Sequence, residues 1–98
     1  MNKYDLIIKP RAIQMAKKAF DWYEEQQLGL GELFLMELEN GYDKLETWPL
    51  SFAKIKTNYR QFVMRTFPYV IVYEILNNSV IVYAVFHTSR HPRKKFRK

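Results

Sequence analysis

The sequence lacks cysteine, and it is poor in other residues that staple or punctuate small folds. It has no cysteine, three glycines and four prolines among 98 residues. Without a thiol the chain has no disulfide, no thiolate metal ligand and no cysteine nucleophile. Its two histidines, His87 and His91, do not make a metal site by themselves. We therefore expect neither a metal nor a cofactor.

Long hydrophobic runs are also missing. The longest uncharged apolar stretches are Val70–Tyr73 and Val80–Phe86, far short of the roughly 20 residues that a membrane-spanning helix needs. Polar residues at positions 2–5 interrupt any signal peptide. Phosphate-binding glycine loops, HExxH and serine-nucleophile motifs are absent as well. We expect a cytoplasmic protein that does not associate with membranes.

What the sequence does contain is a globular composition with segregated charge. The chain is 48% hydrophobic and 27% charged, which suits a single folded domain over residues 1–98. Residues 1–49 carry six basic and nine acidic groups, whereas residues 50–98 carry ten basic groups and one acid, Glu74. A strongly positive half indicates a polyanionic partner such as RNA, DNA or an acidic peptide. The alternative is that the charge only keeps the protein in solution.

Hydrophobic spacing in the first half predicts a strand and two helices. The segment Tyr4–Lys9 is typical of a strand, and helices are expected from Arg11 to about Gln26 and from about Glu32 to Thr47. A short link containing Gly29 and Gly31 makes the helices an antiparallel hairpin. Three apolar stripes should be buried: Ile13, Ala16, Phe20 and Tyr23; Ala12, Met15, Ala19 and Trp22; and Leu30, Phe34, Leu38, Gly41, Leu45 and Trp48. Gly41 is expected to allow close packing against the first helix.

The second half changes to the two-residue period of strands. Three strands are expected at Tyr59–Arg65, Tyr69–Leu76 and Val80–His87. A two-residue turn at Asn77-Asn78 then joins the last two, with Leu76 opposite Ser79 and Val72 opposite Tyr83. The predicted fold class is α+β, with an N-terminal strand, a two-helix hairpin and a three-stranded antiparallel meander packed on the helices.

This register divides the meander into two faces. The face expected to pack on the helices holds Ile71, Tyr73, Ile75, Val80, Val82, Ala84 and Phe86. The other holds Val70, Val72, Glu74, Ile81, Tyr83, Val85 and His87. One helical layer covers one face, so part of the second face should be exposed and available to a partner. The predicted partner-binding residues are Val70, Val72, Ile81, Tyr83 and Val85. The alternative is that the C-terminal segment folds back over them.

Several basic residues and one histidine are candidates for chemistry or for target binding. RNA cleavage through the 2′-hydroxyl needs a base, an acid and cations, for which Arg60, Arg65, His87 and Arg90 are the candidates. Arg60 and Arg65 are an odd number of residues apart on one strand, which points them to opposite faces. The alternative for His87 is a structural role, and the only other acid–base groups on its predicted face are Glu74 and Tyr83. Six of the final nine residues are Lys or Arg, and this segment either binds a target or remains solvated. The predicted target-binding residues are Arg90, Arg93, Lys94, Lys95 and Phe96.

The segment from Tyr59 to Pro92, YRQFVMRTFPYVIVYEILNNSVIVYAVFHTSRHP, resembles the RelE/ParE toxin superfamily. The similarity lies in an arginine-bearing strand, FPY, a VxY strand, a polar turn and an apolar strand that ends near HxxRxP. The helical segment WYEEQQLGLGELFLMEL, within Ala19–Leu38, is similar to the helical hairpin of the family. This resemblance implies the toxin of a bacterial type II toxin–antitoxin pair, held inactive by a cognate antitoxin.

The resemblance also implies two possible targets. RelE-like members cleave mRNA on the ribosome, whereas ParE-like members inhibit DNA gyrase. RelE-like ribonucleases have an arginine where this chain aligns Val70 and a tyrosine where it aligns Phe96, although Arg90 matches their terminal arginine. Because valine and phenylalanine cannot replace those groups, the ParE-like branch is favoured, with no bond chemistry and with operator DNA contacted only through the antitoxin complex. The RelE-like endoribonuclease, an enzyme, is the alternative.

Overall fold

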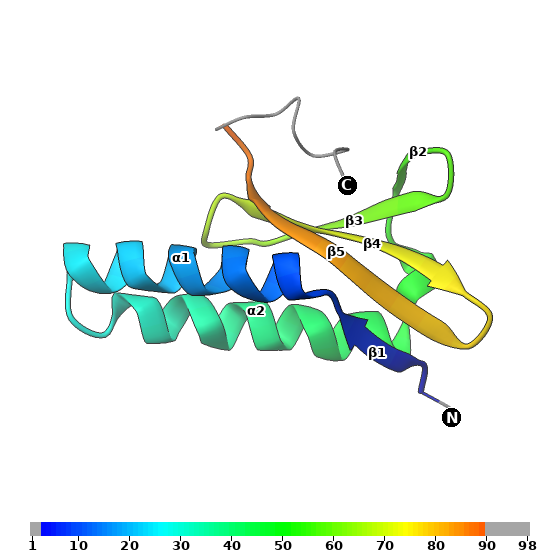
Figure 1. The fold of residues 1–98 in the computed structure, drawn as a ribbon, viewed down its shortest axis with the longest axis horizontal. Coiled ribbons are helices and arrows are strands. Elements are labelled where there is room, and N and C mark those ends of the chain that lie inside the picture. The colour runs from blue at the N-terminus through cyan, green and yellow to red at the C-terminus, as the bar shows by residue number, and fades with distance from the viewer. Residues whose placement is uncertain (1–2, 90–98) are drawn as a thin grey trace.

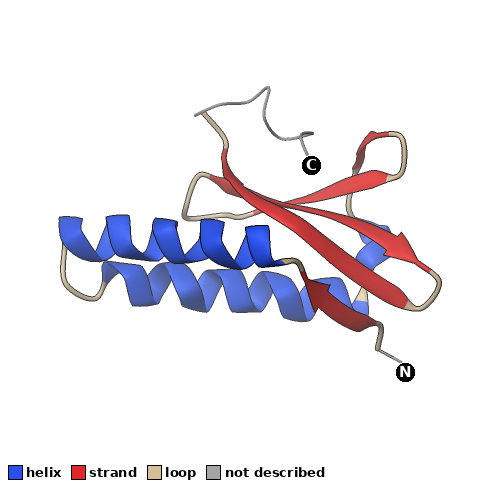
Figure 2. Ribbon diagram, in the orientation of Figure 1, coloured by secondary structure: helices blue, strands red, loops and turns tan. Residues whose placement is uncertain are grey.

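Two helices pack against one side of a mixed five-stranded sheet (Figures 1 and 2). This computed structural model describes residues 3–89. The elements in chain order are β1 (Asp5–Ile8), α1 (Pro10–Gln26), α2 (Leu30–Thr47), the 3-10 helix η1 (Pro49–Ser51), β2 (Lys54–Lys56), β3 (Tyr59–Val63), β4 (Tyr69–Leu76) and β5 (Ser79–His87). The α+β architecture predicted from the sequence is confirmed.

Small residues let the two helices approach closely. The buried face of α1 consists of Ala12, Ala16, Ala19 and Tyr23. At Gly31, near the start of α2, a Cβ atom would lie 2.7 Å from the carbonyl oxygen of Phe20, so a larger residue would push the helices apart. The Glu24 carboxylate accepts the backbone N–H groups of Gly29 and Gly31, each at 2.9 Å, and thereby caps the start of α2.

The buried stripes are narrower than the sequence predicts. Ile13, Trp22 and Trp48, which we expected in the core, are 55%, 47% and 53% exposed. Ile13 and Trp22 lie at the margins of the buried alanine face of α1, and Trp48 lies just past the end of α2. Gly41 is also placed differently, because it faces the sheet, where a Cβ atom would lie 3.0 Å from carbons of Ile71 and Phe62.

The sheet has the strand order β1-β5-β4-β3-β2. β1 runs parallel to β5, and the other neighbouring strands are antiparallel. The helical hairpin and η1 carry the chain from β1, at one edge of the sheet, to β2 at the other edge (Figure 1). β2 was not predicted, because a strand of three residues, Lys54–Lys56, is too short to show a period.

The β4–β5 hairpin follows the predicted register only in part. Leu76 pairs with Ser79 and Glu74 with Ile81, and Asn77 adopts the left-handed conformation (φ 55°) that its two-residue turn requires. Past Tyr73 the register shifts, and Val72 pairs with Ala84 instead of Tyr83. The extra residue, Tyr83, is a β-bulge, and such a bulge moves every following side chain of its strand to the opposite face.

This bulge corrects the predicted faces of the sheet. Ala84 and Phe86, expected to face the helices, join Val70 and Val72 in a second buried cluster, the outer cluster. Val85, expected on the outer face, instead packs into the main core between the sheet and the helices. Met15, Ile55 and Tyr59 pack against the outer cluster. The expectation that the valines are exposed is wrong, because Val70, Val72 and Val85 are all at most 2% exposed.

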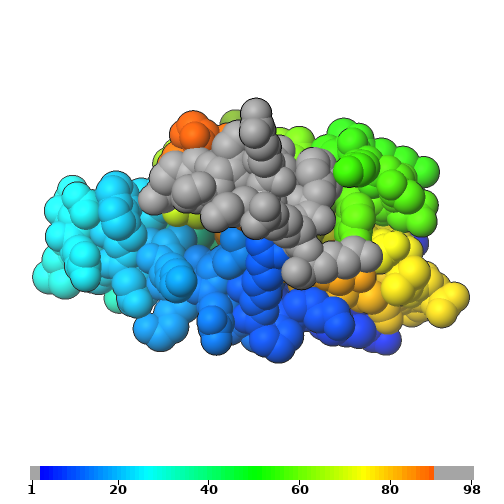
Figure 3. Space-filling view, turned by 45° about the horizontal axis from the view of Figure 1, so that its top comes forward, coloured from blue at the N-terminus to red at the C-terminus, as the bar shows by residue number. Residues whose placement is uncertain are grey.

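The molecule is elongated along its helices. Figure 3 shows the turn between α1 and α2 at one end and the β4–β5 turn at the other. Within residues 3–89 neither helix combines the length and the apolar character needed to cross a membrane.

Candidate binding groove

Arg60, a candidate phosphate-binding cation, is used to hold the chain before β2. Its Nη1 group donates hydrogen bonds to the carbonyl oxygens of Phe52 at 2.6 Å and of Leu50 at 3.4 Å. The Tyr73 hydroxyl donates to the Pro49 carbonyl at 2.6 Å. Burial raises the pKa of Tyr73 to about 12, although the charge of Arg60 acts in the opposite direction. Arg60 and Tyr73 therefore fix η1 and the segment after it to the sheet.

Arg65 was predicted to end a strand, but β3 ends at Val63 and Arg65 lies in the turn between β3 and β4. Its backbone N–H donates to the Glu37 carboxylate of α2 at 2.7 Å. The same carboxylate accepts the N–H groups of Thr66 at 2.8 Å and Phe67 at 3.2 Å. One acid thus fastens this turn to α2 while the Arg65 residue remains exposed.

His87 ends β5 on the helix side of the sheet, which corrects the outer face predicted for it. It pairs with Tyr69 across the strands, and the two rings meet edge-on with centroids 5.2 Å apart. The Nδ1 atom of His87 lies 3.2 Å from the backbone N–H of Ser89. Arg60 pairs with Tyr73, four residues farther along β4 than Tyr69. This places Arg60 roughly 13 Å from His87 along the strand direction.

Glu74 and Tyr83, the two acid–base groups expected on the same face as His87, form a separate pair farther along the strands. The Tyr83 hydroxyl donates to the Glu74 carboxylate at 2.9 Å, and the Tyr83 ring meets Tyr59 edge-on at 5.6 Å. The pKa of Tyr83 is raised to about 12, first by burial and then by the hydrogen bond and the charge of Glu74. Five residues of β4 separate Glu74 from Tyr69, the partner of His87, which is roughly 17 Å.

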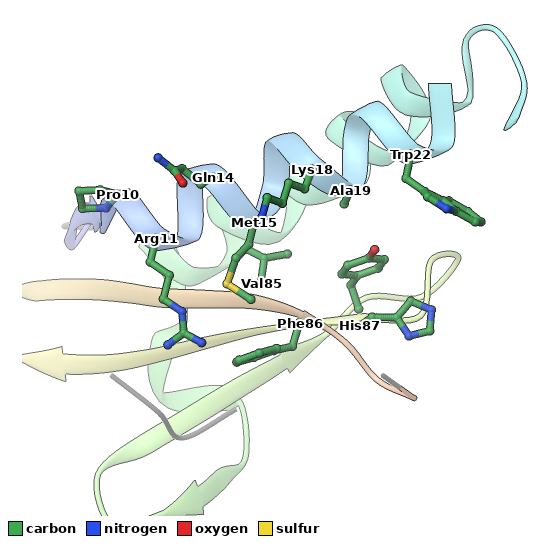
Figure 4. A pocket seen from close by; sticks show the side chains of 11 residues that line it. Pro10, Arg11, Gln14, Met15, Lys18, Ala19, Trp22, Val85, Phe86 and His87 are labelled. Carbon is green, nitrogen blue, oxygen red and sulfur yellow. The ribbon is translucent and has the colours of Figure 1, made fainter. Parts of the chain in front are cut away.

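A groove of about 660 Å³ lies between α1 and the end of β5, and we call it the α1–β5 groove. Figure 4 shows Met15 reaching from α1 toward Val85 in the middle of this groove, with Arg11 and Trp22 on either side. The wall from α1 consists of Pro10, Arg11, Gln14, Met15, Lys18, Ala19 and Trp22. The wall from the sheet consists of Tyr69, Val85, Phe86 and His87.

Apolar surface and positive charge are combined in this groove. The Arg11 guanidinium lies over the Phe86 ring, 5.3 Å from its centroid. Lys18 is exposed on the same wall, and none of the described lining residues carries a carboxylate. Sequence reasoning missed the groove because its walls are some sixty residues apart in the chain. The recurrence of Arg11, Met15, Lys18 and Trp22 on one helical face was the available signal.

The predicted site residues are therefore dispersed. Arg60, Arg65 and His87 occupy three separate places, and Ile81 and Tyr83 lie half-buried on the outer face. Arg90, Arg93, Lys94, Lys95 and Phe96 lie outside the described residues. Among residues 3–89 no group of three His, Asp or Glu side chains could hold a metal ion.

Comparison with known proteins identifies the family. The family model described as the ParE toxin of the type II toxin–antitoxin system parDE matches residues 6–92. A solved structure described as the chromosomal ParDE TA system from P. aeruginosa is similar in fold, with a TM-score of 0.71 and 12% sequence identity over 86% of this chain and 95% of that chain. A search of curated proteins found no match. Because the family model spans nearly the whole sequence and the fold agrees with it, the chain belongs to the ParE toxin family of type II toxin–antitoxin systems.

Proposed function

We propose that this ParE-family toxin inhibits DNA gyrase without making or breaking a covalent bond. The observation that supports this proposal is the dispersal of the groups that ribonuclease chemistry would need. Arg60 is bound to two backbone carbonyls, and His87 lies at the other end of the strands. Val70, at the position where a RelE-like ribonuclease has an arginine, is 2% exposed within the outer cluster. General acid–base catalysis requires its groups within hydrogen-bond reach of one substrate.

The proposed target-binding residues are the cations and the aromatic residue near the C-terminus. The sequence places Arg90 three residues past His87, the last residue of β5, followed by Arg93, Lys94, Lys95 and Phe96. We expect Arg90→Ala to abolish growth inhibition with little effect on stability, since an arginine past a strand end contributes little to folding. A large fall in melting temperature would assign Arg90 a structural role instead.

A supercoiling assay with purified gyrase tests the proposed target directly. We expect the purified toxin to inhibit supercoiling of relaxed plasmid, and the Arg90→Ala protein at the same concentration to leave it unaffected. Supercoiling at the uninhibited rate in the presence of wild-type toxin would contradict the gyrase proposal.

One observation favours the second candidate, a ribosome-dependent mRNA endoribonuclease. His87 lines the α1–β5 groove together with Arg11 and Lys18, so that one titratable group and two cations share a concave surface. Primer extension on cellular mRNA after toxin induction distinguishes the two. New cleavage ends that disappear in His87→Gln would support the ribonuclease, whereas intact messages under full growth arrest would exclude it.

The proposed partner is a cognate antitoxin, through which the pair would contact operator DNA. This proposal rests on membership of the ParE toxin family and on the apolar and cationic groove. Co-expression with the neighbouring reading frame should relieve growth arrest, and the two chains should co-purify. Growth arrest that persists unchanged beside a well-expressed neighbour would show that the pairing is wrong.

A further inference from the structure

The two edge strands of the sheet differ in how well they are protected against pairing with another chain. β2 is three residues long, and its register against β3 is interrupted between Lys54 and Lys56, two exposed lysines. Lysines and an irregular register both discourage an added strand. β1, at the other edge, pairs with β5 in regular register, and its last three residues, Leu6, Ile7 and Ile8, are all apolar (Figure 1). The edge formed by β1 lacks both protections.

Backbone groups on the outer side of β1 point away from the sheet. The N–H groups of Asp5 and Lys9 donate to carbonyl oxygens at the start of the β5 side, each at 2.9 Å, so the odd-numbered residues of β1 bond toward β5. Because these groups alternate sides along a strand, those of Leu6 and Ile8 point the other way. Among residues 3–89 no strand pairs with β1 on that side.

The open stretch of this edge has defined ends. Before it, the N–H group of Tyr4 donates to the carbonyl oxygen of Glu46 in α2 at 2.9 Å, so α2 occupies the edge at Tyr4. After it, α1 begins at Pro10, which has no N–H group to donate. An added strand can therefore pair with Leu6 and Ile8, and it has no reason to extend farther in either direction.

We propose that β1 pairs with β1 of a second copy of this chain, antiparallel and about a twofold axis at Ile7. Leu6 of each copy would exchange backbone hydrogen bonds with Ile8 of the second copy. The two Ile7 residues would then form the non-hydrogen-bonded pair on the axis, where opposite residues are closest. The proposal goes beyond the proposed function, because it involves neither gyrase nor an antitoxin.

The charges that flank Ile7 favour a second copy over other partners. Asp5 and Lys9 each lie two residues from Ile7, and all three are exposed on the same face of the strand. Antiparallel pairing about Ile7 places Asp5 of each copy opposite Lys9 of the second copy, whereas parallel pairing would place like charges together. The pairing also covers the Ile7 side chain, which is 46% exposed in the single chain.

This contact is small and separate from the α1–β5 groove. It consists of backbone hydrogen bonds on either side of the axis, an ion pair at each end and the Ile7 side chains at the centre. We therefore expect a weak dimer, with a dissociation constant on the order of tens to hundreds of micromolar. None of the β1 residues Asp5–Ile8 lines the groove, so the dimer leaves the groove accessible.

Reversing one charge at a time tests the register, with sedimentation equilibrium of the full-length toxin as the measurement. Asp5→Lys and Lys9→Glu should each weaken self-association at least about fivefold, because like charges then face each other. An equimolar mixture of the two variants should recover wild-type association to within about twofold, since opposite charges meet again in the mixed dimer. Glu25→Lys, at an exposed position near the end of α1, is the control for net charge.

A single cysteine tests the twofold axis independently, because the chain has no cysteine of its own. Residues in a non-hydrogen-bonded antiparallel pair have a Cα separation of about 4.5 Å, within the range that a disulfide spans. Ile7→Cys should therefore form a covalent dimer under mild oxidation at least about tenfold faster than Ile13→Cys. Ile13, which is 55% exposed on α1, is the matched control for chance collisions.

Several results would overturn this proposal. Wild-type toxin that remains monomeric up to about 1 mM would exclude the dimer. A mixture of Asp5→Lys and Lys9→Glu that associates no more tightly than either variant alone would exclude the register, as would equal oxidation rates for the two cysteine variants. Hydrogen exchange at Leu6 and Ile8 that slows only when antitoxin is added would assign the edge to that partner instead. Equal melting temperatures establish that the variants remain folded.

Discussion

The two parts of β5 differ in what surrounds them. Residues 79–82 lie between β1 and β4, and Val80 and Val82 are completely buried in the main core. Within residues 3–89, residues 84–87 pair with β4 alone, and three of them line the α1–β5 groove. The bulge at Tyr83 separates the two parts. The first part of β5 thus belongs to the main core, and the second part forms one wall of the α1–β5 groove.

The largest expected effect is a loss of stability from a substitution in the first part of β5, residues 79–82. Val82→Ala removes two buried carbons from a side chain with 0% exposure, which should lower the free energy of unfolding by about 2 to 3 kcal/mol. Partner affinity of the folded fraction should not change, because Val82 is absent from the groove lining. Urea unfolding and a binding titration measure the two quantities. A loss of stability much smaller than this would mean that this part of β5 does not hold the layers together.

A substitution in the second part of β5, residues 84–87, should cost less stability and should also weaken partner binding. Phe86→Leu keeps an apolar side chain in the outer cluster but removes the ring under Arg11, so the free energy of unfolding should fall by about 1 to 2 kcal/mol. Partner binding should weaken severalfold, because the groove loses both the ring and the fixed position of the guanidinium. The same unfolding and titration experiments apply. Unchanged affinity would exclude Phe86 from the interface.

The contact between Tyr83, the bulge residue, and Glu74 can be tested by titrating the Tyr83 hydroxyl with pH. The pKa of Tyr83 is raised to about 12 from an ordinary value of about 10, so the folded state favours the neutral phenol. Its contribution to stability is therefore fully present below about pH 10 and is lost as the pH rises toward 12. Glu74→Gln should lower the pKa of Tyr83 only in part, because burial is the largest cause. Tyrosinate absorbance, compared with a Tyr83→Phe control, gives the value, and no change would refute the coupling.

The smallest effect is expected at the end of β5. His87→Gln should change the free energy of unfolding by no more than about 0.5 kcal/mol, because His87 contacts its neighbours near the surface. Growth inhibition should persist, since the proposed inhibition of gyrase involves no acid–base step. Plating after induction measures this outcome, and complete loss of toxicity with normal folding would support the ribonuclease.

Local patterns predicted the helices, the two-residue turn and the register of the hairpin as far as Tyr73. The bulge was not predictable, because the sequence Val82-Tyr83-Ala84 contains no glycine or turn residue to mark it. Because the bulge was not predicted, Ala84, Val85 and Phe86 were each assigned to the wrong face of the sheet. The exposure of Ile13 and Trp22 also escaped prediction, since periodicity identifies a face but not how closely alanines let it approach its neighbours.

The candidate site was predicted less well than the fold. Reasoning from single strands grouped Arg60, Arg65 and His87 by residue type, yet each of the three makes contacts with a different part of the molecule. The groove depends on α1 meeting β5, a contact between the two ends of the described chain that no local pattern contains.

Residue-resolved hydrogen exchange along β5, with and without the partner, tests the division of the strand most directly. In the free toxin the amides of residues 79–82 should already be strongly protected, because β1 and β4 flank them. Binding of the antitoxin should slow exchange mainly after Val82, in the part that borders the groove. Protection that rises equally along all of β5, or only before the bulge, would contradict the claim that the strand's second part is the binding wall.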